Sequence, residues 1–468
     1  MREIQKSRNK RRKLFIKALV GCAEVHNLAG DNVDAMKYAE SAIKLLMKWD
    51  MKKEMSLALM LKGNILGDMG RFGSFEKMLN EAIAICQTIK FKDGEASGFI
   101  SIGLYYEITG CFKKAKECYL SAIRILTKTG NMYEMANCYN NLGSVYNTLG
   151  EYKKALYYYK KALNIRRKIK DARGESETLN NIAYVYEDLY DYEKALYYNK
   201  QSLDIREKIG YKKGKGITFV NMGHLLLLRG YYDKALTYLI EGARIFQEIG
   251  SERLYAKAIN NLAYAYLNLG YLKKSKKLLT ETLDIRKRLK DRYGAVYTIK
   301  NFGYLYLELN KLDMAKRYLK EARKIADGLS MESILPQVLN GLFEIYLKRH
   351  FYKEAIKCLQ QSLEISIKSG LKKDEGYTLF NFGRYYSAKK IYTKAENYFE
   401  KSLKVLNEVN EPFSLGVCFY HYGVNLFIMN KQRGAKEFLH KAESIFKKLG
   451  LKWWLEKTKN AKLTYKNN

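Results

Sequence analysis

The sequence predicts an all-α fold, an α-solenoid of about eleven stacked helix-turn-helix units of 40 residues each. Three observations predict it: small residues recur at a 40-residue period, each period carries two amphipathic stripes, and the 468 residues include only two prolines. Because an interior proline costs about 3 kcal/mol in a helix, so few prolines indicate a chain that is helical throughout. The 47% hydrophobic content provides ample material for a core and argues against disorder.

Small residues define the period. The glycines that lie 40 residues or a multiple of 40 apart are Gly63, Gly103, Gly143, Gly223, Gly303, Gly383 and Gly423. A glycine inside a helix costs about 1 kcal/mol relative to alanine, so we expect a close helix contact at each one, with Gly143 and Ala155 letting the two helices of a unit touch. Phe75, Ser275 and Phe343 break the small-residue series and predict local distortion in units two, seven and nine.

The fourth unit shows the two helices of each repeat. Residues 136–149 carry apolar side chains at helical spacing, and Gly150 follows as the expected C-cap. Residues 152–169 repeat the stripe as the second helix. Polar turns are predicted after second helices at 170–174, 290–294 and 373–376, and both prolines, Pro336 and Pro412, fall at the expected start of a first helix.

Three segments follow from this arrangement: a basic N-terminal arm (1–13), the solenoid (14–450), and a C-terminal capping helix with a tail (451–468) that contains Trp453 and Trp454. The basic arm and the residues up to Cys22 imitate a lipoprotein signal. Lys17 interrupts that short apolar run, and the 40-residue frame runs through it, so we expect no membrane attachment.

Sequence features of enzymes and metal sites are missing from the chain. There is no phosphate-binding glycine loop, no nucleophile elbow and no H-E-x-x-H motif. The five histidines and seven cysteines have no metal-ligand spacing and no C-x-x-C pair. We therefore expect a non-catalytic protein without cofactor or metal, in a reducing compartment such as the cytoplasm.

The unit resembles a known repeat. Tyr139-x-x-Leu142-Gly143-x-x-Tyr146, followed by Gly150, Ala155, Tyr159 and Ala162, resembles the tetratricopeptide repeat (TPR). The 40-residue length is similar to the subclass of kinesin light chains, the spindle-orientation adaptor LGN and bacterial peptide-sensing regulators. The resemblance implies a right-handed superhelix whose first helices line a concave groove, and it is only weakly specific for function.

In that frame, asparagines and aromatic residues fall on the groove side of the first helices. The predicted groove residues are Asn140, Asn141, Asn180, Asn181, Tyr184, Asn221, His224, Asn260, Asn261, Tyr264, Asn301, Tyr304, Asn381 and Arg384. An asparagine amide donates and accepts, so it matches a peptide backbone of any sequence, and groove asparagines of the kinesin light chain and LGN classes clamp extended peptides. The alternative is that these asparagines cap or bridge neighbouring first helices.

The formal charge is +35, from 84 Lys and Arg against 49 Asp and Glu. Much of the excess falls near the ends of second helices, where cations gain from the helix dipole, and we predict a basic edge there. Its residues are Arg166, Arg167, Lys168, Arg206, Lys212, Lys213, Arg286, Lys287 and Arg288.

These patterns predict a scaffold or receptor that binds an extended peptide of a protein partner, and they favour an acidic partner. A ligand-responsive regulatory sensor is the second hypothesis. Binding of nucleic acid is possible but less favoured, because the charge lies on an edge and not in the groove.

Overall fold

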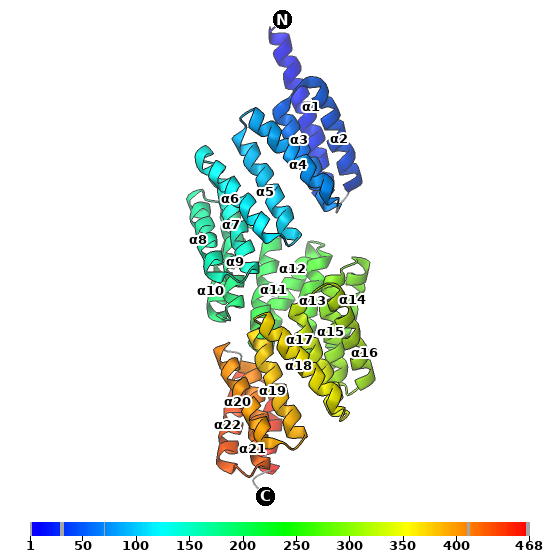
Figure 1. The fold of residues 1–468 in the computed structure, drawn as a ribbon, viewed down its shortest axis with the longest axis vertical. Helices are drawn as coiled ribbons and strands as arrows, with labels where there is room; N and C mark the ends of the chain where they lie inside the picture. Colours follow the sequence, from blue (N-terminus) through cyan, green and yellow to red (C-terminus); the bar gives the residue numbers. More distant parts are fainter. Residues whose placement is uncertain (1, 29–31, 70, 410–411, 465–468) are drawn as a thin grey trace. The chain divides into compact units, whose positions relative to one another are not determined.

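The computed structural model describes residues 2–28, 32–69, 71–409 and 412–464. Within these ranges the chain consists of 23 α-helices and one short 3-10 helix, joined by tight corners, and contains no strand (Figure 1). The chain divides into two compact units, unit 1 (Met1–Leu189) and unit 2 (Tyr190–Asn468). In both units successive helices run antiparallel and pack side by side, as predicted for a solenoid.

The helix bounds follow the predicted period. Unit 1 contains α1 (Arg2–Leu28), α2 (Asn32–Trp49), α3 (Lys52–Asp68), α4 (Phe72–Thr88), α5 (Lys92–Ile108), α6 (Phe112–Thr129), α7 (Met132–Thr148), α8 (Tyr152–Lys168) and α9 (Ala172–Asp188). The first half of unit 2 contains α10 (Tyr192–Lys208), α11 (Lys212–Leu228), α12 (Tyr232–Glu248), α13 (Glu252–Asn268), α14 (Leu272–Arg288), α15 (Arg292–Glu308) and α16 (Leu312–Gly328). The second half contains η1 (Glu332–Ile334), α17 (Leu335–Lys348), α18 (Tyr352–Lys368), α19 (Lys372–Ala388), α20 (Tyr392–Glu408), α21 (Pro412–Ile428), α22 (Gln432–Leu449) and α23 (Lys452–Thr464).

The in-phase glycines bring the two helices of a repeat together, as predicted. A Cβ on Gly143 would lie 2.7 Å from the ring of Tyr159, and one on Gly383 would lie 2.6 Å from Cδ1 of Phe399. The second helix therefore inserts a large side chain over each glycine. The predicted close approach at the paired small residues is confirmed in equivalent repeats, where a Cβ on Gly223 would lie 3.4 Å from the Ala235 carbonyl and one on Gly423 would lie 3.2 Å from the Ala435 carbonyl.

The predicted turns at 170–174 and 290–294 are shorter than expected, and the turn predicted at 373–376 lies a few residues earlier. Helix α9 already begins at Ala172 because the Asp171 carboxylate accepts a 2.9 Å bond from the backbone N–H of Gly174 and caps the helix. Asp291 caps α15 in the same way through the N–H of Gly294. The range 373–376 lies inside α19, because Gly370, with a φ of +65°, makes the turn before it.

Distortion occurs at one of the three predicted places. In unit nine, α17 is preceded by the 3-10 turn Glu332–Ile334, whereas α4, which carries Phe75, and α14, which carries Ser275, keep the regular length of 17 residues. Phe75 needs no distortion, because its ring occupies the space that Gly67 leaves on α3.

The ends of the chain also follow the frame. Pro336 lies in the first turn of α17 and Pro412 begins α21, as predicted. Residues 2–13, the predicted basic arm, are the first part of α1. Helix α23 begins 40 residues after α21, in the place of a further first helix, and its Trp454 stacks on Phe446 with ring centroids 5.1 Å apart. None of the helices in the described ranges has the length and hydropathy that crossing a bilayer requires.

Candidate functional site

Asparagines on neighbouring first helices pair with one another. The amide Nδ2 of one asparagine donates to the Oδ1 of an asparagine 41 residues earlier in three places: Asn181 to Asn140 (3.1 Å), Asn301 to Asn260 (3.4 Å) and Asn381 to Asn340 (2.9 Å). These bonds link α9 to α7, α15 to α13 and α19 to α17. The alternative hypothesis, that the asparagines bridge first helices, therefore holds for these pairs.

Burial divides the predicted groove asparagines into two sets. The buried ones are Asn180, Asn221, Asn260, Asn301 and Asn381. Their side chains are at most 6% exposed and offer little surface to a ligand, so their place in a binding groove stays a prediction. The partly exposed ones are Asn140, Asn141, Asn181 and Asn261.

A buried arginine extends the asparagine pairs toward the second helices. Arg166 on α8 donates to the hydroxyl of Thr178 at 2.6 Å and to the carbonyl of Gly174. Thr178 in turn donates to Asn140 Oδ1 at 3.4 Å. Arg286, Thr298 and Asn260 repeat this relay in unit 2, with distances of 2.8 and 3.1 Å.

Three arginines of the predicted basic edge are interior residues. Arg206 donates to the Gly214 carbonyl at 2.9 Å and to the Thr218 hydroxyl at 2.7 Å, and Arg166, Arg206 and Arg286 are all at most 5% exposed. The prediction that they form an exposed edge was wrong, because they hold a second helix to the next first helix. Burial lowers the pKa of Arg286 to about 10, although Asp291 favours its charge.

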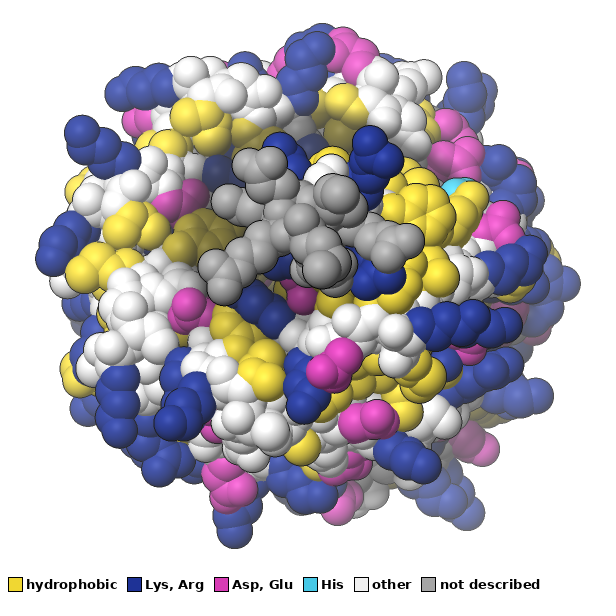
Figure 2. Space-filling view, turned by 90° about the horizontal axis from the view of Figure 1, so that it is seen from above, with side chains coloured by type: hydrophobic (Ala, Val, Ile, Leu, Met, Phe, Trp, Pro, Cys, Tyr) yellow, Lys and Arg dark blue, Asp and Glu magenta, His cyan; other side chains and the backbone are white. Residues whose placement is uncertain are grey.

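The remaining edge residues are exposed: Arg167, Lys168, Lys212, Lys213, Lys287 and Arg288. Two of them have acidic partners, since Arg167 pairs with Glu175 at 2.7 Å and Arg288 pairs with Glu252 at 3.1 Å. Figure 2 shows Lys and Arg side chains on all sides of the visible surface, interspersed with Asp and Glu. A continuous basic edge stays a prediction.

A sequence signal for the buried arginines was available. Each is followed by a glycine after eight residues and a threonine after twelve, as in Arg166, Gly174 and Thr178. The glycine leaves room for both the capping carboxylate and the guanidinium, since a Cβ on Gly174 would clash with Asp171 Oδ2 and lie 2.8 Å from Arg166 Nε, and one on Gly294 would clash with Asp291 Oδ2 and lie 2.9 Å from Arg286 Nε. Three in-register copies of this triplet distinguish an interior arginine from a surface one.

The first helices of unit 2 present a set of aromatic and charged side chains that lie within electrostatic reach of one another. We call this set the unit 2 face: Tyr264 (α13), Lys300 and Tyr304 (α15), Glu344 (α17), Tyr377 and Arg384 (α19), His421 (α21) and Lys457 (α23). Tyr264, Tyr304 and Arg384 were predicted from the sequence, whereas Lys300, Tyr377, His421 and Lys457 were not part of that prediction.

Lys300 and Tyr304 are anchored to the next first helix. The Lys300 ammonium donates to Gln337 Oε1 and the Tyr304 hydroxyl donates to the Gln337 carbonyl, both at 2.7 Å. Burial lowers the pKa of Lys300 to about 8, although Asp374 favours the charge. These bonds fix the direction of both side chains on the unit 2 face.

Arg384 is held between two rings and a carboxylate. It binds Glu344 through both terminal nitrogens, with the Nη2 to Oε2 distance at 3.0 Å, and its guanidinium lies 5.8 Å from the ring of Phe343 and 5.5 Å from that of Phe380. Such bidentate pairs combine charge with fixed geometry. The positive charge of Arg384 is therefore already paired with the Glu344 carboxylate.

Lys457 differs from Arg384 in having no carboxylate of the described residues at ion-pair distance, although Glu308 and Glu344 lie near enough to favour its charge. Its ammonium lies 4.7 Å from the rings of Trp453 and Trp454 and 5.2 Å from that of Tyr420, and no carboxylate of the described residues forms an ion pair with it. Burial lowers the pKa of Lys457, and nearby Arg384 lowers it further. His421 lies beside it, with its ring 6.5 Å from Trp454, and burial first, then Arg384 and Lys457, lower the pKa of His421 well below its usual value.

The first helices of unit 1 carry a different chemistry. Glu107 on α5 accepts bonds from Ser144 on α7 at 2.6 Å and from Tyr119 on α6 at 3.0 Å, while Asn147 donates to Asp188 at 3.0 Å. Tyr184 of the predicted groove lies half-buried on α9. Carboxylates and amides dominate here, and the described residues of both units contain no cluster of His, Cys, Asp and Glu that could hold a metal.

The comparison with protein families decides the identity of the repeats. Models of the tetratricopeptide repeat match residues 134–208, 256–289, 301–327 and 335–408. The chain is a TPR protein. The matches do not distinguish the subclass of kinesin light chains and LGN, which stays a prediction.

Solved structures resemble the TPR chain in fold. A Rap protein complexed with competence and sporulation factor has 18% identity and a TM-score of 0.53, over 75% of this chain and 98% of its own. The apo form of the quorum sensor NprR from B. thuringiensis has 17% identity and a TM-score of 0.55, over 77% and 99%. The apo form of RapI has 18% identity and a TM-score of 0.51, over 59% and 99%. At such identity the likeness concerns the fold alone, and a comparison with curated proteins finds no match.

Proposed function

We propose that this TPR protein is a non-catalytic scaffold or receptor that binds an extended, acidic peptide segment of a partner protein on the unit 2 face. The observation that carries the proposal is Lys457, a cation that is set on three aromatic rings and that no carboxylate of the described residues contacts directly, although Glu308 and Glu344 lie near enough to favour its charge. A peptide carboxylate would make the direct ion pair that the more distant Glu308 and Glu344 do not make, and burial of that pair between rings strengthens it.

Neighbouring side chains support an extended ligand. Tyr264, Tyr304 and Tyr377 are partly exposed and offer rigid apolar walls beside Lys457 and Arg384. The partly exposed Asn261 on α13 offers an amide to a peptide backbone, and His224 lies half-buried on α11. The asparagines Asn140, Asn141 and Asn181, with Tyr184, form a smaller set of the same kind in unit 1. All seven cysteines are free thiols, which agrees with a cytoplasmic location.

The test is affinity capture from native lysate, with and without nuclease, followed by binding of the captured partner's acidic segments as synthetic peptides. We expect capture to survive nuclease and to weaken about tenfold in Lys457→Gln, which removes one charge-assisted bond. Lys452→Gln, an exposed position on the same helix, is the matched control. Loss of capture with nuclease would instead favour nucleic acid, and equal binding by both lysine variants would contradict the proposed site.

A regulatory sensor is the second candidate, favoured by the likeness in fold to a quorum sensor. In that case a bound peptide would change the protein's choice of a second partner. The measurement is capture of partners with and without a saturating acidic peptide. An unchanged set of partners would contradict the sensor role and leave the scaffold role as the remaining candidate.

A further inference from the structure

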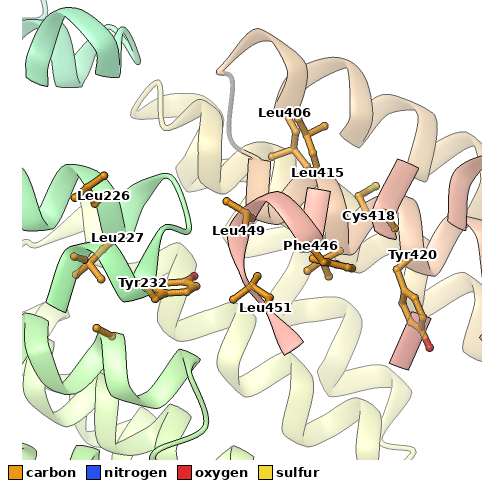
Figure 3. Close-up of a cluster of buried hydrophobic side chains, with 14 of the residues drawn as sticks. Leu226, Leu227, Tyr232, Leu406, Leu415, Cys418, Tyr420, Phe446, Leu449 and Leu451 are labelled. Atoms are coloured by element: carbon orange, nitrogen blue, oxygen red, sulfur yellow. The ribbon is translucent and has the colours of Figure 1, made fainter. Parts of the chain in front are cut away.

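The two ends of unit 2 meet. In a solenoid each repeat normally contacts only its neighbours, so residues five repeats apart are not expected to touch. One buried apolar cluster nevertheless joins residues of α11–α14 to residues of α19–α23, while α15–α18 belong to a second cluster. Figure 3 shows Tyr232 at the start of α12 pointing toward Leu449 and Leu451 at the α22–α23 corner. Unit 2 thus closes on itself.

The closing contact is made by a few groups at helix corners. The Lys373 ammonium at the start of α19 donates to the Leu228 carbonyl at the end of α11, at 3.1 Å. The ring of Tyr232 lies 5.8 Å from that of Phe413, at the start of α21, in an edge-on geometry. This hydrogen bond and the corner packing are small compared with the interfaces between consecutive helices.

Gly230 is the point of closest approach. It forms the α11–α12 corner with a φ of +76°, and a Cβ there would lie 2.8 Å from Cβ of Phe413 and 3.3 Å from Cδ1 of Leu449. The next corner of the same kind, Gly270, has a φ of +83° and no heavy atom within 4 Å of a Cβ. Both glycines satisfy the same backbone requirement, a positive φ. Only at Gly230 would a side chain also clash with residues about five repeats away, Phe413 and Leu449.

We propose that the contact of the α11–α12 corner with the α19, α21 and α22–α23 corners is a clasp that closes unit 2 and opens to admit large ligands to the unit 2 face. The side chains of that face lie on first helices that the clasp joins end to end, from α13 to α23. A contact built from corners separates more easily than a helix–helix interface, because little buried area is lost. The clasp does not depend on the identity of the ligand, and its tests use none.

The first test is hydrogen exchange by mass spectrometry on Gly230→Ala and Gly270→Ala. Both variants carry the strain of alanine in the left-handed region, so their difference isolates the contact with Phe413. In Gly230→Ala we expect exchange to rise together at residues 224–234, 412–416 and 446–455, by about tenfold, which equals about 1.4 kcal/mol. In Gly270→Ala only its own corner should change. Equal exchange patterns in the two variants would overturn the clasp.

The second test measures access. With the exposed Cys22 and Cys111 and the half-buried Cys118 replaced by Ser, the remaining native thiols are buried, and Tyr377→Cys places a reporter on the unit 2 face. We expect a maleimide with a long polyethylene glycol chain to react much more slowly than a small maleimide, about tenfold or more for a barrier of 1.4 kcal/mol. Phe413→Ala, which opens the clasp from its other side, should remove most of that difference. A ratio that Phe413→Ala leaves unchanged would show that the clasp does not gate the face.

Discussion

The junctions between repeats use two chemistries at one position. At the α14–α15 junction the buried position on the second helix is Arg286, which bonds Gly294 and Thr298 of the next first helix. The equivalent position of α12 is Phe246, whose ring packs into the space that Gly216 leaves on α11, the first helix of its own repeat. The same position holds Leu406 and Phe446 farther along, fully buried in each case. A ring needs only volume, but a guanidinium needs two specific acceptors on the next helix. Arginine junctions therefore specify which repeat follows, and apolar junctions do not.

Exchange of the two chemistries should have the largest effect. Phe246→Arg introduces a cation at a position that lacks the acceptors of the arginine junctions. The residues eight and twelve positions later are Leu254 and Ala258, not glycine and threonine. A buried charge without partners should destabilise the junction by more than about 4 kcal/mol. Because a solenoid can open locally, the measurement is hydrogen exchange across α12 and α13. Phe246→Leu is the control, at less than about 1.5 kcal/mol; an arginine tolerated as well as leucine would mean that the acceptors are unnecessary.

Lys300 is a buried cation outside the arginine junctions, and it makes stability depend on pH. Its pKa is about 8 in the folded chain against an ordinary 10.5, so between these values the unfolded chain binds more protons. The free energy of unfolding should therefore rise with pH from 8 to 10.5, by about 3 kcal/mol. Denaturant unfolding of wild type and Lys300→Met at several pH values measures this term, since the variant lacks it. Lys320→Met, on the exposed side of α16, should retain the wild-type slope.

Removing one guanidinium should cost less than burying an unpaired one. Arg286→Met keeps most of the volume but loses the bonds to Gly294 and Thr298, and we expect a loss of about 2 kcal/mol. Leu406→Met, at an apolar junction, should lose less than about 1.5 kcal/mol. A double-mutant cycle with Thr298→Val measures the coupling by denaturant unfolding. Additive losses would indicate that Arg286 acts through its volume alone.

The smallest effect concerns the glycine of the arginine junction. Gly294→Ala should destabilise by about 1 kcal/mol, because the new Cβ would press first on the capping carboxylate of Asp291, whose Oδ2 is the nearest atom, and then on Arg286 Nε. At Gly73, inside α4 with no heavy atom within 4 Å of a Cβ, the same change should stabilise by up to about 1 kcal/mol. Thermal unfolding of the two variants measures whether the melting temperature falls in Gly294→Ala and rises in Gly73→Ala. Stabilisation by both changes would show that Gly294 is not required by the arginine.

Most of the fold could be predicted, but only part of the candidate site. The 40-residue period placed the helices and both prolines, because the period expresses local packing that each repeat satisfies in the same way. Asn301 and Asn381 were assigned to a ligand because a sequence shows which side chains lie on a first helix, not which of them the neighbouring repeat already binds. Lys457 was missed because the third ring beside its ammonium, that of Tyr420 on α21, is brought there only by the tertiary structure, although Trp453 and Trp454 precede it on α23 itself.

The sequence by itself determined the repeat, the helices and their amphipathic faces, since these depend on residues within 40 positions of one another. The tertiary structure alone decided that Arg166, Arg206 and Arg286 lie inside, because an arginine is stable there only with the acceptors that the next helix brings. It also decided that Gly230 meets Phe413, a contact between residues far apart in the chain. Such contacts depend on the summed rotation of several repeats, and no single repeat encodes that sum.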